Sequence, residues 1–168
     1  KYYLTILGVI LLTISSKISI PFYPVPMTLQ TLVVFFIAAS MGMIGFYSTF
    51  IYVVLGVLGL PLFANGGGIG YIFSPTFGFL YGMVISAFII AYILKSEVKT
   101  GLIKLSATIL AGAFVIFLCG ISHLSFFVGL EQAINLGLLP FLYSEFLKIV
   151  LAIAIIFGLI QRVNQKNS

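Results

Sequence analysis

Long apolar runs, separated by short turn signals, dominate this chain. A helix that crosses a bilayer needs about 20 mostly apolar residues, and the apolar pattern divides into six such segments. The spans predicted from this pattern are 2–20, 28–43, 46–60, 76–94, 102–120 and 140–160. The second and third spans are short. They either cross a locally thin region of the membrane or begin deeper than these bounds indicate. The sequence therefore predicts an all-α membrane protein with six transmembrane helices, forming one domain over residues 1–168.

Prolines and glycines mark the predicted connections between these runs. Pro21, Pro24 and Pro26 stop the first run and favour an extended loop, because proline fixes the backbone and cannot donate a hydrogen bond. A glycine-rich stretch, NGGGIGYIFSP, follows the third run. Pro140 suits the first turn of the sixth helix. We predict a long loop over residues 121–139, which carries the chain's single histidine, His123.

The composition supports a membrane environment. Of the 168 residues, 62% are apolar and 7% are charged, whereas a soluble domain has about 25% charged residues. So few charges cannot cover the surface of a soluble globule. The composition therefore excludes a cytosolic enzyme, a disordered chain and a nucleic-acid binder.

The positive charges indicate an orientation in the membrane. Six spans place both termini on one side, together with the connections after the second and fourth spans. That side carries six of the eight cations: Lys1, Lys95, Lys99, Lys104, Arg162 and Lys166. The positive-inside rule therefore predicts that both termini are cytoplasmic. The proline loop, the glycine-rich loop and the predicted 121–139 loop then lie together on the outer side, where they could capture a ligand.

Few residues carry candidate chemistry. The sequence has no G-x-x-x-x-G-K phosphate loop, one histidine and one cysteine, Cys119. We therefore expect no ATPase activity of its own, no catalytic residues, no metal site and no cofactor. Glu145 and Lys148 are three residues apart and share a face of the sixth helix. Ionisable groups inside a membrane indicate a functional site, although such a pair could also neutralise itself near a helix N-terminus.

Two outer segments are the other candidates. The glycines after Asn65 allow a ligand to approach the backbone closely and expose its N–H groups, although a flexible turn would look the same. Thr28 and Gln30 place polar groups at the start of the second helix.

Together these segments resemble the BioY biotin transporters, the substrate-binding S components of energy-coupling-factor (ECF) transporters. The stretch IPFYPVPMTLQTLVV matches that family's first loop-and-helix signature, and GLPLFANGGGIGYIFSPTFGFLYG resembles its second. The segment from Glu145 to Ala152 resembles the last-helix motif E-x-x-K-x-x-L-A, in which the acid is more often aspartate. Lys17 departs from the pattern, because a neutral polar residue is expected there.

The resemblance implies high-affinity biotin binding at the outer face and biotin uptake across the cell membrane. It also implies three partners, which are a membrane scaffold subunit and two cytoplasmic ATPases. The substrate-binding residues carried over by position are Asn65, Glu145 and Lys148. Glu145 and the Asn65 amide would hydrogen-bond biotin's ureido ring. Its carboxylate would bind Lys148, Lys17 or the N–H groups of the glycine-rich loop. Gln30 is a further substrate-binding candidate, and Tyr71, Phe73 and Tyr143 would line an apolar slot.

Two further expectations follow from the resemblance. Gly66, Gly67 and Gly68 are predicted to form a gate over the site. Small residues on the first span, Gly8, Ser15 and Ser16, are predicted to dock the scaffold subunit, because small residues let helices approach closely in lipid.

The alternatives are an S component for another vitamin, an autonomous small-molecule carrier or channel, and an intramembrane enzyme or assembly factor. A carrier or channel predicts symmetric repeats or charges on several helices, and an enzyme needs a nucleophile and base that this composition lacks.

Overall fold

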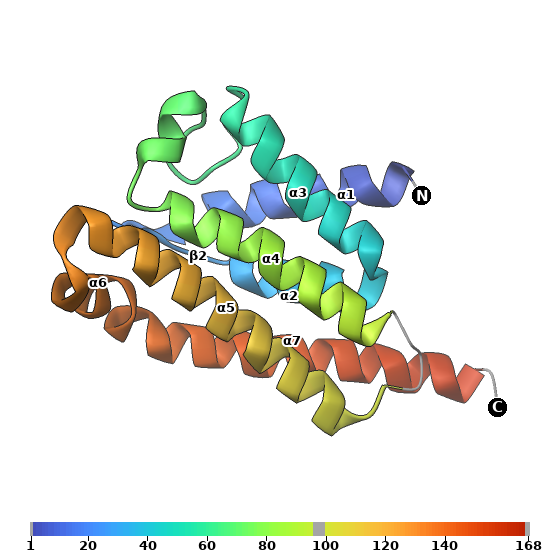
Figure 1. Ribbon diagram of the computed structural model, residues 1–168. Coiled ribbons are helices and arrows are strands. Elements are labelled where there is room, and N and C mark those ends of the chain that lie inside the picture. The colour runs from blue at the N-terminus through green and yellow to red at the C-terminus, as the bar shows by residue number, and fades with distance from the viewer. Residues whose placement is uncertain (1, 96–99, 167–168) are drawn as a thin grey trace.

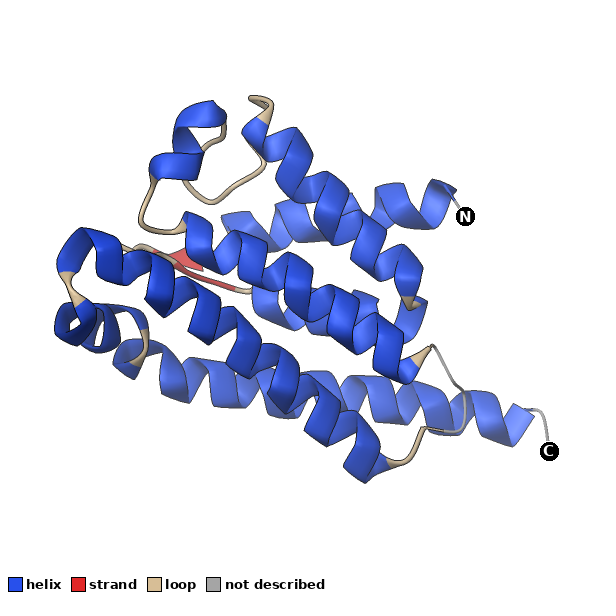
Figure 2. Cartoon of the chain, viewed as in Figure 1, coloured by secondary structure: helices blue, strands red, loops and turns tan. Residues whose placement is uncertain are grey.

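The computed structural model describes residues 2–95 and 100–166 as a bundle of helices (Figure 1). Lys1 and Lys99, from the charge count above, lie outside the described residues, and so does the side chain of Lys166. The long helices run roughly alongside one another, and loops gather mainly at one end of the bundle (Figure 2). The helices, in chain order, are α1 (Tyr2–Lys17), α2 (Gln30–Met41), α3 (Met43–Val57), α4 (Phe77–Leu94), α5 (Leu102–Val128), α6 (Leu130–Gly137) and α7 (Leu139–Lys166).

Short elements complete the loop end. Strands β1 (Ser19–Ile20) and β2 (Met27–Thr28) pair antiparallel and close the proline loop. The 3-10 helix η1 (Ile69–Phe73) lies within the glycine-rich connection before α4. The structure therefore confirms the all-α class, with one two-stranded pairing added.

The lengths of the helices differ more than the sequence pattern predicts. Three helices in the described part of the chain, α4, α5 and α7, are long and apolar enough to cross a membrane. Helices α1, α2 and α3 are apolar but have only 16, 12 and 15 residues. The 12 residues of α2 span about 18 Å at 1.5 Å per residue, which is shorter than the hydrocarbon core of a bilayer.

The predicted loop over residues 121–139 is wrong. Helix α5 continues through this region to Val128, so His123 is helical, and α6 follows after Gly129. Residues 121–128 contain no proline or glycine that would end the helix. Gly129 ends it with a positive φ of 79°, a conformation that glycine adopts at low cost.

Close helix packing forms the interior of the bundle. A Cβ atom at Gly112 of α5 would contact Ser86 and Ile90 of α4, and one at Gly82 of α4 would contact the Ile116 backbone of α5. Glycines at these positions let the two helices approach closely, as is common in membranes. The core between the helices is apolar, whereas many large apolar side chains on the outer faces are exposed. This distribution fits a bundle whose outer surface contacts lipid.

The two ends of the bundle differ in character. Both termini lie at one end, together with the α2–α3 turn and the C-terminal end of α4 (Figure 1). The proline loop, the glycine-rich connection and α6 lie at the other end, which we call the loop end. The α2–α3 turn is a single residue, Gly42, with a φ of 58°.

Candidate ligand-binding site

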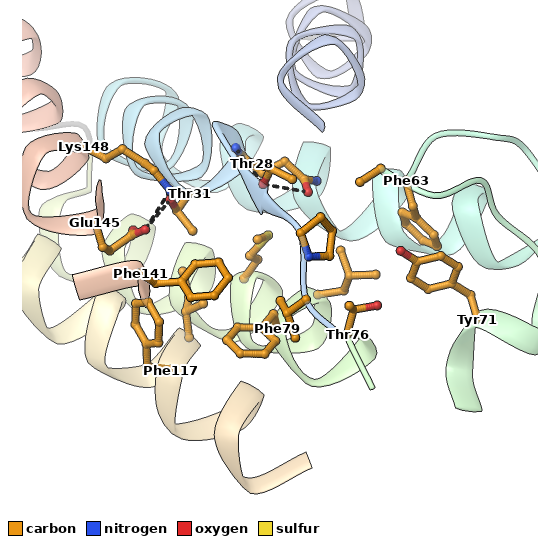
Figure 3. Close-up of a pocket in the computed structure, with 17 residues that line it drawn as sticks. Thr28, Thr31, Phe63, Tyr71, Thr76, Phe79, Phe117, Phe141, Glu145 and Lys148 are labelled. Atoms are coloured by element: carbon orange, nitrogen blue, oxygen red, sulfur yellow. Dashed lines mark hydrogen bonds and ion pairs between the residues drawn. The ribbon is translucent and has the colours of Figure 1, made fainter. Parts of the chain in front are cut away.

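A pocket lies near the loop end of the bundle (Figure 3). Small-molecule pockets in proteins are usually mostly apolar, with a few polar groups that fix the ligand. The wall comes from the proline loop, α2, the glycine-rich connection, α4, α5 and α7. Its residues are Val25, Pro26, Thr28, Gln30, Thr31, Phe63, Ala64, Tyr71, Thr76, Phe79, Leu80, Met83, Ile116, Phe117, Phe141, Glu145 and Lys148.

A buried ion pair stands at one side of this pocket. Lys148 Nζ donates to Glu145 Oε2 at 2.9 Å, and both residues are buried. Thr31 of α2 completes a triangle, because its hydroxyl donates to Glu145 Oε2 at 3.0 Å and accepts from Lys148 Nζ at 3.3 Å. The helical spacing of the pair on α7 places both charged groups against α2. A buried ion pair of this kind is stable only when such additional hydrogen bonds accompany it.

One oxygen of this ion pair has no partner. Glu145 Oε1 is buried and accepts no hydrogen bond from the described residues. An unsatisfied buried acceptor costs about 1–3 kcal/mol, and more when it is charged. Since Glu145 lines the pocket, a ligand with an N–H or O–H group could satisfy this oxygen.

A chain of hydrogen bonds fixes the part of the pocket wall formed by Gln30 and Phe63. The Gln30 amide nitrogen donates to the Tyr52 hydroxyl at 2.8 Å, and Tyr52 donates to the Leu62 carbonyl at 3.0 Å. The Ser16 hydroxyl donates to the same carbonyl at 2.7 Å. These contacts tie α1, α2 and α3 to the backbone just before Phe63, which lines the pocket.

The rest of the pocket is mainly apolar. Four phenylalanines contribute to the wall, and Phe63 packs against Tyr71 with ring centroids 4.6 Å apart. Figure 3 shows Glu145, Lys148 and Thr31 at one side of the cavity, and Phe63 and Tyr71 at the opposite side. A ligand that fits this pocket therefore has a hydrogen-bonding head and an apolar body.

Four of the predicted substrate-binding residues line this pocket: Gln30, Tyr71, Glu145 and Lys148. Asn65 does not, because it is exposed, although its neighbour Ala64 does. Tyr143 is 77% exposed and Phe73 is 75% exposed, and neither lines this pocket. Asn65, Tyr143 and Phe73 therefore lie outside the wall of this pocket, and their roles in substrate binding stay predictions.

The three glycines predicted as a gate lie beside the pocket, outside its wall. Gly66 pairs with Phe63 in an isolated bridge, and Gly68 donates to the Gly56 carbonyl at 2.7 Å. A Cβ atom at Gly67 would overlap the Leu60 carbonyl. The gate stays a prediction, and a valine at Gly67 cannot test it because it would disturb the loop itself.

The small residues of α1 that were predicted to dock the scaffold subunit lie inside the chain. Gly8, Ser15 and Ser16 are buried inside the chain, and a Cβ atom at Gly8 would overlap the Ser48 side chain of α3. These small residues therefore let α1 approach the rest of the bundle, and docking of the scaffold subunit through α1 stays a prediction.

Lys17 and His123 also lie outside the pocket wall. Lys17 Nζ donates to the Phe63 carbonyl at 2.5 Å, so it holds the backbone at Phe63 without lining the pocket. His123 Nε2 lies 3.1 Å from the Ser74 carbonyl and joins α5 to the segment before α4.

Sequence reasoning missed several residues of the site, notably Thr31 and Phe141. Phe141 lies four residues before Glu145, so it shares a helical face with that residue, and this spacing could have identified it. No local pattern distinguishes Thr31, because its role depends on the contact between α2 and α7. Among the described residues no three His, Cys, Asp or Glu side chains form a metal-binding group.

Comparison with known proteins supports one family. The family model described as "BioY family" matches residues 1–165. The biotin transporter BioY of Thermotoga maritima is 38% identical over 145 residues, which cover 84% of this chain and 85% of the relative. The probable biotin transporter BioY of Pyrococcus horikoshii is 38% identical over 154 residues, covering 90% and 91%.

A solved structure has the same fold. The crystal structure of the S-component for biotin from an ECF-type ABC transporter aligns with a TM-score of 0.78 and 24% identity. The alignment covers 94% of this chain and 86% of that chain.

Proposed function

The chain belongs to the BioY family, and on that premise we propose that its pocket binds biotin for uptake across the cell membrane. In this role the protein is the biotin-specific S component of an ECF-type transporter and not an enzyme. The observation that carries the assignment of the site is the unpaired Glu145 Oε1 in the pocket wall.

The chemistry of biotin matches this side of the pocket. Its ureido ring has N–H donors next to a carbonyl acceptor, and Glu145 and Lys148 offer an acceptor and a donor side by side. A ureido N–H can donate to Glu145 Oε1, and the third ammonium hydrogen of Lys148 can serve the ureido carbonyl. The sulfur-containing ring and the valeryl chain then contact apolar residues such as Phe79 and Phe141.

The pocket's place in the fold supports a site on the outer side of the membrane. Its wall includes residues of the proline loop and the glycine-rich connection, and these segments lie at the end opposite both termini (Figure 1). Lys95, Lys104 and Arg162 belong to segments near the end that holds the termini. The positive-inside rule places that end in the cytoplasm. We propose six spans, α1 to α5 and α7, with the loops completing the crossings of the short helices.

The partners follow from the same proposal. An S component needs a membrane scaffold subunit and two ATPases to supply energy, and this sequence has no phosphate loop. We expect the whole chain to act as one binding domain and to purify together with such a module.

Calorimetric titration of the purified protein with biotin tests the assignment. Glu145→Gln should weaken biotin binding at least tenfold, because hydrogen bonds to charged groups contribute about 1.5–3 kcal/mol. Glu131→Gln is the matched control, since Glu131 begins α6 at the same end and lies outside the pocket. Thiamine and riboflavin should not bind.

If Glu145→Gln binds biotin with wild-type affinity, Glu145 is not part of the binding site. Tight binding of another vitamin in place of biotin would reject the proposed function itself.

A further inference from the structure

The charges in the pocket wall are already paired. Among the lining residues of the described chain, Glu145 and Lys148 are the charged ones, and they bind each other at 2.9 Å. Their formal charges cancel, so the pocket offers an anionic ligand no separate cation. Biotin, however, carries a carboxylate at the end of its valeryl chain.

The other cations of the described chain are not placed to bind this carboxylate. Lys17 donates to the Phe63 carbonyl and lies outside the wall. Lys95 ends α4, Lys104 lies in the first turn of α5, and Arg162 lies near the C-terminal end of α7. These three segments belong to the end of the bundle that holds the termini (Figure 1).

The side of the pocket opposite the ion pair is apolar apart from uncharged hydroxyl groups. Tyr71 stands there with its hydroxyl toward the cavity, and Thr76 lies between the two sides (Figure 3). The Thr76 hydroxyl is within 3.0 Å of the Ser74 hydroxyl. Hydroxyl groups can donate to a carboxylate oxygen and also to an amide or ester carbonyl.

We propose that this site recognises the neutral cyclic urea and does not require the carboxylate, so that it also binds uncharged amides and esters of biotin. This inference rests on the proposed function, because it assumes that the ureido ring occupies Glu145 and Lys148. The side-chain end of the ligand then points toward Tyr71 and Thr76 and meets uncharged donors.

The main titration uses the wild-type chain, so its result does not depend on whether a variant folds. The purified protein in lipid nanodiscs is titrated with biotin, with biotin amide and with a biotin alkylated on a ureido nitrogen. We expect the amide to bind within about fivefold of biotin, and the ureido-alkylated compound to bind at least tenfold more weakly. Biotin affinity should also change little with salt concentration, since no free cation is neutralised.

A variant of Lys17 checks the cation that binds the Phe63 carbonyl. Lys17→Met should leave the ratio of the amide and biotin dissociation constants unchanged, because Lys17 already binds a backbone carbonyl.

The possible results separate the inference from the function. A loss of more than fivefold for the amide, or an amide-to-biotin ratio that changes in Lys17→Met, overturns the inference and leaves biotin binding intact. Either result would mean that the biotin carboxylate binds a cation. Weak binding of the amide would indicate a reversed ligand whose carboxylate binds Lys148, and a changed ratio in Lys17→Met would indicate Lys17. Absence of binding by biotin itself would defeat the proposed function as well.

Discussion

At the scale of single residues, Thr31 deserves comparison with the charged pair beside it. Its hydroxyl uses both its donor and its acceptor capacity on that pair, at 3.0 Å to Glu145 and 3.3 Å to Lys148. Thr31 donates to Glu145 Oε2, which is the oxygen that Lys148 also binds, and it accepts from the Lys148 ammonium group. None of these contacts uses Glu145 Oε1. We therefore expect Thr31 to act as a positioning residue that keeps Oε1 of Glu145 available to a ligand.

Removing this hydroxyl should weaken biotin binding. Thr31→Val keeps the shape of the side chain but loses both hydrogen bonds, so the carboxylate can rotate and biotin affinity should fall about tenfold. Thr31→Ser retains the hydroxyl and should restore most of the affinity. Titration calorimetry of both variants provides the measurement. Equal affinity in the valine and serine variants would assign Thr31 to packing alone.

The candidate site could be predicted from sequence where side chains share one helix. Glu145 and Lys148 are one turn apart, and the structure places them together as that spacing predicts. Tyr143 is two residues before Glu145, which is about 200° around the helix, and its exposure follows from this geometry. The orientation of Asn65 could not be predicted, because it depends on the conformation of an irregular loop.

At the scale of helices, α1 shows how a pattern of small residues can mislead. Such residues allow close approach in lipid, but the pattern does not say whether the neighbouring helix belongs to a partner or to the same chain. Here the neighbour is α3, whose Ser48 fills the space beside Gly8. The pattern therefore indicates a close helix contact, and within this chain that contact is made with α3.

A large side chain at Gly8 should destabilise the fold. Gly8→Trp overlaps Ser48 and should lower the free energy of unfolding by about 1–3 kcal/mol, the usual cost of overpacking. Gly158→Trp is the matched control, because a Cβ atom at Gly158 of α7 meets no neighbouring atom within 4 Å. Thermal unfolding in detergent compares the two. A Gly8→Trp variant as stable as the control would contradict the buried position of α1's small residues.

The continuation of α5 is a second case at this scale. A span was assigned by length, so the predicted helix ended where the bilayer was expected to end, at Gly120. Gly120 instead lies within the helix, against the ring of Phe79. Glycine ends a helix only when its backbone adopts a suitable conformation, and this happens at Gly129.

At the scale of the whole molecule, the fold separates the pocket from the termini. The helical class and the approximate position of each apolar helix could be predicted from hydropathy, because backbone groups in lipid must be satisfied within helices. The pocket could not, since its wall combines residues from Val25 to Lys148 that meet only after the bundle has formed.

The proposed orientation can be tested with single cysteines in a Cys119→Ala background. Gln132→Cys lies in α6 at the loop end, and Gln161→Cys lies near the end of α7. Both positions are exposed. A membrane-impermeant maleimide should label Gln132→Cys in intact cells, and should label Gln161→Cys only after the membrane is opened. The reverse pattern would place the pocket on the cytoplasmic side.

The link between α1 and the pocket wall also has a mechanical consequence. The last turn of α1 holds two adjacent backbone carbonyls, through Ser16 to Leu62 and through Lys17 to Phe63. A 16-residue helix is a stiff arm about 24 Å long, so a tilt of about 10° displaces one end relative to the other by about 4 Å. A force applied to the N-terminal end of this lever, in the proposed orientation from inside the cell, would therefore move Phe63 and reshape the cavity without any contact with the ligand.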